Sequence, residues 1–342
     1  RLDISPTVDH NGVIRARIMS EVSDLDPSVM SAAGPALRTR KTETEFNVMD
    51  GGTIVLSGLL SRDVNASIDK VPLLGDIPVL GALFLWWSCT GVLLWRVHRA
   101  DQGGPDEHVA SAMMGLPLMA AGVLGVNATL ADGSAQGVWL AFLSALALWG
   151  WIELAFLCGV ITGPVRAPCP PDLKGSARFW RAFGTIAWHE AALVLTLVGL
   201  FVATRGAAND FALWAFVILF VARISAKLNL FLGVPRINLD FLPSPLSHLA
   251  SYFRQRPISG FFPFSVTLIA LALGCLVERI WSAATPGALI GFTLLAALTA
   301  LALLEHWFMV WRVRDDKLWR WLLPAADPQP TTRRLRKDSH GL

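Results

Sequence analysis

The residues GDIPVLGALFLWW (75–87) divide the chain into two parts of different character. Up to the start of this stretch the chain is polar, and residues 1–76 contain no apolar run long enough to cross a bilayer. After it, one long apolar segment follows another as far as residue 311. A hydrocarbon core needs about 20 mainly apolar residues in a helix, so length alone predicts that the second part is embedded in a membrane.

The composition agrees with this prediction, because 54% of the residues are apolar and only 16% are charged. The four cysteines lie in or beside apolar segments without paired spacing, so neither a disulfide framework nor a zinc motif is predicted. The net charge of +3 arises largely in loops and in the C-terminal tail, and we expect no nucleic-acid partner. The chain begins at Arg1 rather than at Met, which favours a fragment or a displaced gene start.

The first part has the alternation of β-strands. Apolar and basic side chains alternate over residues 14–18, and Thr, Phe or Val alternates with charged or amide residues over 41–48. A third run, 53–60, follows Asp50-Gly51-Gly52, a turn sequence typical of hairpins. We therefore expect a β segment with a hairpin across this turn.

Seven transmembrane helices are predicted in the second part. Their approximate spans are 78–95, 109–131, 137–163, 183–204, 211–234, 261–277 and 287–311. The predicted fold class is mainly α: a polytopic membrane bundle of about seven transmembrane helices, with a short N-terminal β segment.

Lys and Arg are distributed unequally between the two sides of this bundle. The segments after the first, third, fifth and seventh helices hold seventeen of them, whereas the other connections hold only Arg205 and Arg279. Basic residues collect on the cytoplasmic side of membrane proteins. The sequence therefore predicts an N-terminus outside and a cytoplasmic C-terminus, with the β segment facing the periplasm of a Gram-negative cell.

The connection between the fifth and sixth helices contains a further short helix. Ser244-Pro245 is a good N-cap and first-turn pair, and Leu246, Leu249 and Phe253 then recur at helical spacing. This segment fits a helix that lies in the cytoplasmic interface, which we favour, or an amphipathic loop helix packed on the bundle.

Ionisable residues interrupt four of the predicted helices. They are Glu153 in the third, His189 and Glu190 in the fourth, Arg223 and Lys227 in the fifth, and Glu305 and His306 in the seventh. Such groups are costly in hydrocarbon and by default mark a functional site. At 1.5 Å per residue they lie roughly 9–15 Å from the cytoplasmic surface, so four helices bring polar groups to one layer.

Two interpretations of this layer involve its carboxylates. Glu153, Glu190 and Glu305 can balance Arg223 and Lys227 in a charge network that holds the bundle together. The second interpretation is catalysis by the His and Glu groups. Adjacent His and Glu residues project about 100° apart on a helix, unlike the zinc-binding His-Glu-x-x-His arrangement, and we expect no enzyme activity.

A third interpretation is a cofactor site. His189 with Glu190, and Glu305 with His306, each combine an imidazole with a carboxylate that can fix its tautomer. Such a set can bind a metal or the central magnesium of a chlorophyll. The cofactor would then be bacteriochlorophyll or another tetrapyrrole.

Segments of the first part resemble the C-terminal core of the secretins, multimeric outer-membrane β-channels of secretion and pilus systems. They are LDISPTV (2–8), RKTET (40–44), DGGTIVLSGL (50–59) and KVPLLGDIPVLGALF (70–84). The resemblance covers about 84 residues and lacks the upstream periplasmic domains. Because a closed barrel needs every strand edge paired, we do not expect this fragment to form a channel by itself.

Segments of the second part resemble the PuhE-type photosynthetic complex assembly proteins of purple bacteria. They are ALFLWW (82–87), WGWIE (149–153), GVITGP (159–164), CPP (169–171), HE (189–190), RISAKLNLFLGV (223–234), LASYF (249–253) and LEHWF (304–308). The resemblance covers residues 82–324 and implies an inner-membrane protein needed for accumulation of the reaction centre and its antenna. That family would begin close to Ala82, so the secretin-like residues before it indicate a fusion at this point, whether natural, erroneous or artificial.

The sequence thus predicts three domains: a secretin-like β fragment (1–76), a seven-helix transmembrane PuhE-like domain (77–324) and a basic disordered tail (325–342). The predicted function is that of an inner-membrane assembly factor for the bacterial photosynthetic reaction centre and antenna complex. Its partners would be the lipid bilayer and reaction-centre or antenna subunits. Two alternatives are a secretin-type component of a secretion or pilus system and a membrane-embedded enzyme that uses the His/Glu site.

Overall fold

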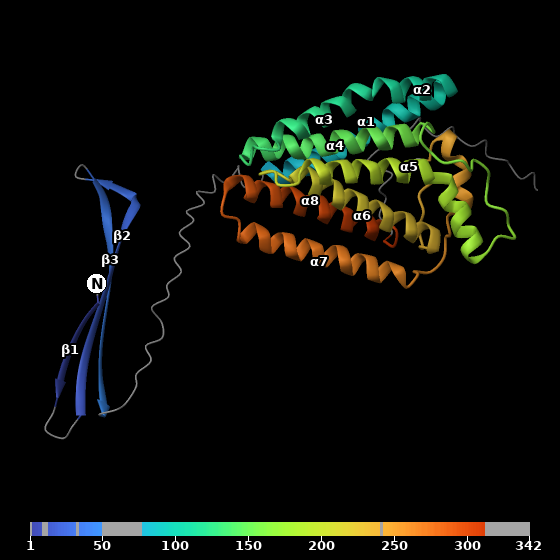
Figure 1. Cartoon of the computed structure of the whole chain (residues 1–342). Helices are drawn as coiled ribbons and strands as arrows, with labels where there is room; N and C mark the ends of the chain where they lie inside the picture. The colour runs from blue at the N-terminus through green and yellow to red at the C-terminus, as the bar shows by residue number, and fades with distance from the viewer. Residues whose placement is uncertain (1, 9–12, 32–33, 50–76, 240–241, 312–342) are drawn as a thin grey trace, which may run out of the picture. The chain divides into compact units, whose positions relative to one another are not determined.

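The computed structural model describes residues 2–8, 13–31, 34–49, 77–239 and 242–311 (Figure 1). The chain divides into two compact units, Arg1–Asp69 and Lys70–Leu342. The predicted hairpin across Asp50-Gly51-Gly52 and the predicted tail at 325–342 lie outside the described residues.

The first unit contains a three-stranded antiparallel sheet in the order β1-β2-β3, formed by β1 (Leu2–Val8), β2 (Val13–Ser31) and β3 (Gly34–Met49). Both predicted strand runs, 14–18 and 41–48, lie in this sheet. Arg15 and Arg17 are exposed on β2, and the apolar residues that alternate with them are half-buried. Arg17 pairs with Glu43 of β3, and Arg15 lies 3.7 Å from Glu45. Opposite charges across neighbouring strands support the observed register.

In the described part of the second unit, seven segments are long and apolar enough to cross a membrane. The helices are α1 (Ile77–Gly103), α2 (Pro105–Met114), α3 (Leu116–Thr129), α4 (Ala135–Leu157), α5 (Gly175–Ala203), α6 (Phe211–Leu232), α7 (Phe261–Trp281) and α8 (Pro286–Phe308). The seven segments match the seven predicted spans, and α2 and α3 together make the second.

The break between α2 and α3 falls at Gly115. Pro117, in the first turn of α3, has no N–H for the helical ladder, and its ring would clash with the carbonyl four residues earlier. The N–H of Gly115 instead closes α2 on the carbonyl of Ser111 at 3.2 Å. The predicted single helix over 109–131 is therefore two helices within one apolar segment.

Several helix ends also differ from the prediction. α1 continues to Gly103 rather than 95, and α5 begins at Gly175 rather than 183, because polar turns extend both helices beyond their apolar spans. α4 ends at Leu157 rather than 163. There Gly159 adopts φ +74°, and the N–H of Val160 reaches the carbonyl of Ala155 at 2.9 Å, which together form a Schellman-type C-terminus.

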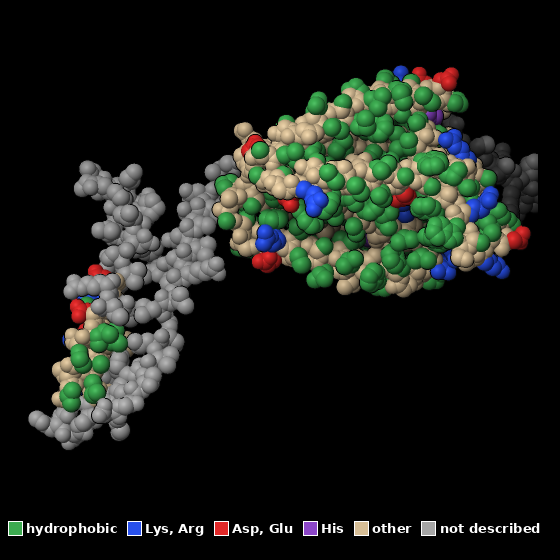
Figure 2. Space-filling view, viewed as in Figure 1, with side chains coloured by type: hydrophobic (Ala, Val, Ile, Leu, Met, Phe, Trp, Pro, Cys, Tyr) green, Lys and Arg blue, Asp and Glu red, His purple; other side chains and the backbone are tan. Residues whose placement is uncertain are grey.

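α4 and α8 form the centre of the bundle. In each of them 56% of the apolar window is buried, against 17–22% in the other five segments. α3 and α5 lie on either side of α4, and α7 packs on α8 (Figure 1). Figure 2 shows a largely apolar outer face, with Lys and Arg gathered towards the end of the bundle where α5 begins.

The predicted loop helix is a 3-10 helix, η1 (Ser244–Tyr252), packed on the bundle. Leu246 and Leu249 are buried and pack with Phe156 of α4. The Tyr252 hydroxyl donates to the carbonyl of Ala167 at 3.0 Å. The apolar side chains of η1 therefore contact protein, which is the second of the two placements considered and not the favoured one.

Candidate functional site

α6 carries two cations one turn apart, and each meets a carboxylate from a different helix. Arg223 Nη2 donates to Glu153 Oε2 of α4 at 2.6 Å, and Lys227 Nζ donates to Glu190 Oε1 of α5 at 2.5 Å. Glu153 and Glu190 are each only 7% exposed. A buried charge is costly alone and tolerable when paired. The two ion pairs therefore tie α4 and α5 to one face of α6.

The opposite face of α6 carries a neutral polar cluster. Ser225 and Asn229 follow the two cations by two positions each, which places them about 200° around the helix. Ser225 Oγ lies 2.8 Å from His306 Nε2 of α8, and Asn229 Nδ2 donates to Ser265 Oγ of α7 at 3.0 Å. Sequence reasoning missed Ser225, Asn229 and Ser265. The sequence feature that could have indicated Ser225 and Asn229 was their i,i+4 spacing within RISAKLN (223–229).

His306 has partners at both ring nitrogens. Its Nδ1 lies 2.7 Å from the carbonyl oxygen of Ala302, and its Nε2 lies beside the Ser225 hydroxyl. A carbonyl can only accept, so Nδ1 carries a proton, and in the neutral ring Nε2 accepts from Ser225. The imidazole is thus held at the contact of α6 and α8.

His189 is fully enclosed, and neither ring nitrogen has a hydrogen-bond partner among the described residues. Its ring lies against Phe156, with centroids 4.2 Å apart, and its Nε2 is 3.7 Å from Glu153 Oε1. Its backbone N–H donates to the carbonyl of Thr162 at 3.1 Å. The imidazole therefore lies beside Glu153, whereas the adjacent Glu190 meets Lys227.

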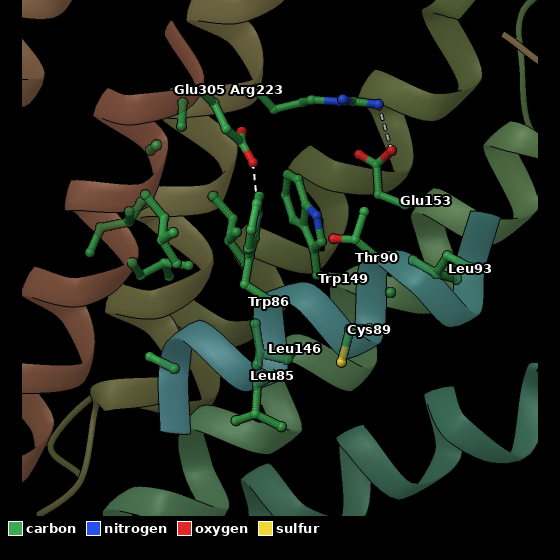
Figure 3. A pocket seen from close by; sticks show the side chains of 18 of the residues that line it. Leu85, Trp86, Cys89, Thr90, Leu93, Leu146, Trp149, Glu153, Arg223 and Glu305 are labelled. Carbon is green, nitrogen blue, oxygen red and sulfur yellow. Dashed lines mark hydrogen bonds and ion pairs between the residues drawn. The ribbon is translucent and has the colours of Figure 1, made fainter. Parts of the chain in front are cut away.

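Glu305 lines a cavity of about 350 Å³ between α1, α4, α6 and α8, together with Glu153 and Arg223 (Figure 3). Its carboxylate accepts a hydrogen bond from Trp86 Nε1 of α1 at 2.8 Å. Within the described part of the chain, no Lys or Arg forms an ion pair with Glu305. Sequence reasoning did not single out Trp86. Its i, i+3, i+4 spacing with Cys89 and Thr90, which line the same cavity, was the available signal.

The structure thus separates the four residues of the cofactor hypothesis. His189 does not share a site with Glu190, and His306 does not share one with Glu305. Among the described residues, no group of three or more His, Cys, Asp or Glu side chains could hold a metal ion. In this arrangement the His189 ring is enclosed, and both His306 nitrogens have hydrogen-bond partners. The cofactor hypothesis stays a prediction.

The helical unit defines the class of the protein. The model of the DUF3623 family, described as a protein of unknown function, matches residues 75–330, and the chain belongs to this family. A relative in Rhodobacter capsulatus is described as an uncharacterized 30.4 kDa protein in the puhA 5′ region. It is 51% identical over 253 residues, which are 74% of this chain and 92% of the relative. No solved structure matches the chain.

The first unit is similar to a second family. The model for bacterial type II and III secretion system proteins, the secretins, matches residues 1–86. Secretin PulD of Klebsiella pneumoniae is 40% identical over 87 residues, and secretin OutD of Pectobacterium carotovorum is 38% identical over 87 residues. Each match covers 25% of this chain but only 13% of the secretin. The two family matches overlap at residues 75–86, where the sequence changes character.

Proposed function

We propose that the helical unit spans the inner or intracytoplasmic membrane of a photosynthetic bacterium and acts there in assembly of the reaction centre and antenna complex. The observation that carries this proposal is the 51% identity to the Rhodobacter capsulatus protein of the puhA 5′ region, over 92% of that protein. The resemblance to PuhE-type assembly proteins over residues 82–324 supports the same role.

The charge distribution supports an orientation. Arg166 and Lys174 lie between α4 and α5, and Arg254 and Arg256 lie between η1 and α7, at one end of the bundle. The connections at the other end carry Arg205, after α5, and α7 ends with Arg279. The excess of basic residues favours a cytoplasmic location for the first end, with the segment before α1 in the periplasm.

The polar layer has a structural role in this proposal. Glu153 pairs its charge with Arg223 and Glu190 with Lys227, so the two pairs fix the rotation of α4, α5 and α6 inside hydrocarbon, although Glu153 Oε1 and Glu190 Oε2 have no hydrogen-bond partner among the described residues. The secretin-like unit corresponds to 13% of secretin PulD, and its described part is a three-stranded sheet, so a channel is not part of this proposal.

Affinity purification tests the proposed partners. The full chain, tagged at its C-terminus, is expressed in a phototroph during induction of its photosynthetic complex and is extracted from membranes with mild detergent. We expect reaction-centre or antenna subunits to be enriched over a control purification of an unrelated polytopic protein from the same membrane. Equal amounts of these subunits in both purifications would contradict the proposal.

A further inference from the structure

Arg178, Arg254 and Arg256 gather at the end of the bundle where η1 lies. Arg178 belongs to the first turns of α5, and the other two follow η1. The guanidinium carbons of Arg178 and Arg254 lie 4.5 Å and 5.9 Å from the centroid of the Phe231 ring, near the end of α6. Among the described residues, no carboxylate forms an ion pair with any of the three arginines.

The backbone holds two of these arginines in place. The N–H of Arg254 donates to the carbonyl of Leu230 at 2.9 Å, and that of Arg256 donates to the carbonyl of Val234 at 3.1 Å. Between these two carbonyls, Gly233 adopts φ +129°, a backbone conformation that residues other than glycine rarely adopt. These bonds fix the backbone positions from which the Arg254 and Arg256 side chains extend.

Arg178 is 5% exposed, yet its guanidinium is incompletely satisfied. Nη2 donates to the carbonyl of Tyr252 at 2.6 Å, whereas Nη1 is buried without a partner among the described residues. Burial, with the nearby charges of Arg178 and Arg256, lowers the pKa of the Arg254 guanidinium, although an arginine stays protonated at neutral pH. Clustered, partly desolvated positive charges are stabilised by an anion.

A groove of about 890 Å³ lies between α5, α6 and η1; most of its lining side chains are apolar, and Glu190, Arg223 and Lys227 also line it. The residues of α5 that line it extend from Phe179 to Val194, about 22 Å along the helix axis. One hydrocarbon leaflet is about 15 Å thick, so the groove is long enough for an acyl chain. Phe231 also lines the groove, and the same ring lies beneath Arg178 and Arg254. The groove and the arginine cluster are therefore continuous.

We propose that the arginine cluster and this groove together bind one anionic phospholipid. Its phosphate would lie among Arg178, Arg254 and Arg256, because the guanidinium group matches the geometry of phosphate oxygens, and an acyl chain would fill the groove. Basic pockets at the cytoplasmic ends of membrane helices bind acidic head groups. The proposal rests on the membrane orientation given above and not on a role in photosynthesis, so failure of either leaves the other standing.

The test uses the full chain, purified in neutral detergent and freed of lipid. Dioleoylphosphatidylglycerol, dioleoylphosphatidylcholine and inorganic phosphate are titrated separately, and the shift in the unfolding midpoint is measured together with the lipid retained in native mass spectra. We expect phosphatidylglycerol to give the largest shift. Arg254→Gln and Arg256→Gln should each weaken its binding by roughly fivefold, since a basic residue near a membrane contributes about 1 kcal/mol.

Arg279→Gln is the matched control, because Arg279 lies 5.0 Å from the Phe292 ring but belongs to the last turn of α7. This variant should bind phosphatidylglycerol as the wild type does. Equal stabilisation by phosphatidylcholine would overturn the head-group assignment, and equal stabilisation by inorganic phosphate would overturn the lipid assignment. The comparison of the three probes on the wild-type chain decides the head-group and the lipid assignment even if a Gln variant fails to fold. Arg254→Lys keeps the positive charge and is a second variant for measuring phosphatidylglycerol binding.

Discussion

At the scale of single residues, the sequence located the charged groups but not their partners. The spacing of Arg223 and Lys227 fixes their common face within α6, because both belong to one helix. Which carboxylate each cation meets depends on the rotation of α4, α5 and α8 about their axes, and local spacing does not determine that rotation. Glu305 accordingly meets the indole of Trp86 and not a cation in the described structure.

The Lys227–Glu190 pair gives the first prediction. Lys227→Met leaves Glu190 as a buried carboxylate without its cation, which costs about 3–5 kcal/mol. We expect less of this variant in membrane fractions on quantitative immunoblots, and we expect Lys227→Met with Glu190→Met to recover most of the loss. Arg279→Met, at an exposed helix end, should stay at the wild-type level. A double variant no more abundant than Lys227→Met would show that the pair is not coupled.

Substitution of the two buried histidines should affect thermal stability differently. His189→Leu removes no side-chain hydrogen bond seen in the structure, so the midpoint of thermal unfolding should change little. His306→Leu breaks the bonds to Ser225 and Ala302 and leaves a buried hydroxyl unsatisfied, which costs about 1–3 kcal/mol. The midpoint of this variant should fall.

Protein abundance and reaction-centre absorbance test whether these histidines bind a cofactor. If His189 binds a cofactor after rearrangement of Phe156, His189→Leu would stay abundant while reaction-centre absorbance declines. Unchanged abundance and absorbance in both variants would exclude the cofactor hypothesis for these histidines.

At the scale of helices and strands, hydropathy located all seven apolar segments but not their ends. Helix ends depend on backbone hydrogen bonds, such as those at Gly159. One such arrangement joins distant parts of the chain: the carbonyl of Thr162 accepts from the N–H groups of Trp188 and His189, while the N–H of Val165 donates to the carbonyl of Gly184. No local pattern in the sequence indicates these bonds, although they hold His189 in place.

This arrangement predicts a strict requirement for glycine at position 163. A Cβ atom at Gly163 would overlap the carbonyl oxygen of Gly184, and backbone cannot yield as a flexible side chain does. Gly163→Ala should therefore lower the free energy of unfolding by about 1–3 kcal/mol or more. Gly199→Ala in α5 is the control, because a Cβ there meets nothing within 4 Å. It should be neutral or stabilising by up to about 1 kcal/mol. Similar unfolding midpoints for the two variants would contradict this account.

At the scale of the whole molecule, two family matches meet within one chain. The sequence located the junction because a polar, alternating pattern gives way to an apolar one within GDIPVLGALFLWW (75–87), and the two matches overlap at 75–86. The pairing of β2 with β3 was not predicted, since the expected hairpin partner of 41–48 was 53–60. Strand pairing depends on register with a distant segment, which alternation alone does not determine.

The two units should separate under proteolysis. The chain has lysines at positions 41 and 70 before α1, and its remaining lysines are Lys174, Lys227, Lys317 and Lys337. In the proposed orientation Lys174, Lys317 and Lys337 are cytoplasmic, and Lys227 lies within the bundle. A lysine-specific protease added to sealed spheroplasts should therefore leave one resistant fragment that begins at Val71. Cleavage at Lys174 before permeabilisation would contradict the orientation, and joint resistance of both units would contradict their independence.

In the proposed function, the helical unit supports accumulation of the photosynthetic complex. This role is tested most directly by near-infrared absorbance of membranes from a Rhodobacter capsulatus strain that lacks its own puhA 5′-region relative and expresses this chain instead. We predict that the deletion lowers the reaction-centre and antenna bands and that the chain restores them in proportion to its amount in the membrane. Bands that stay low while the chain is present at the level of the native protein, or bands that the deletion never lowers, would contradict this prediction.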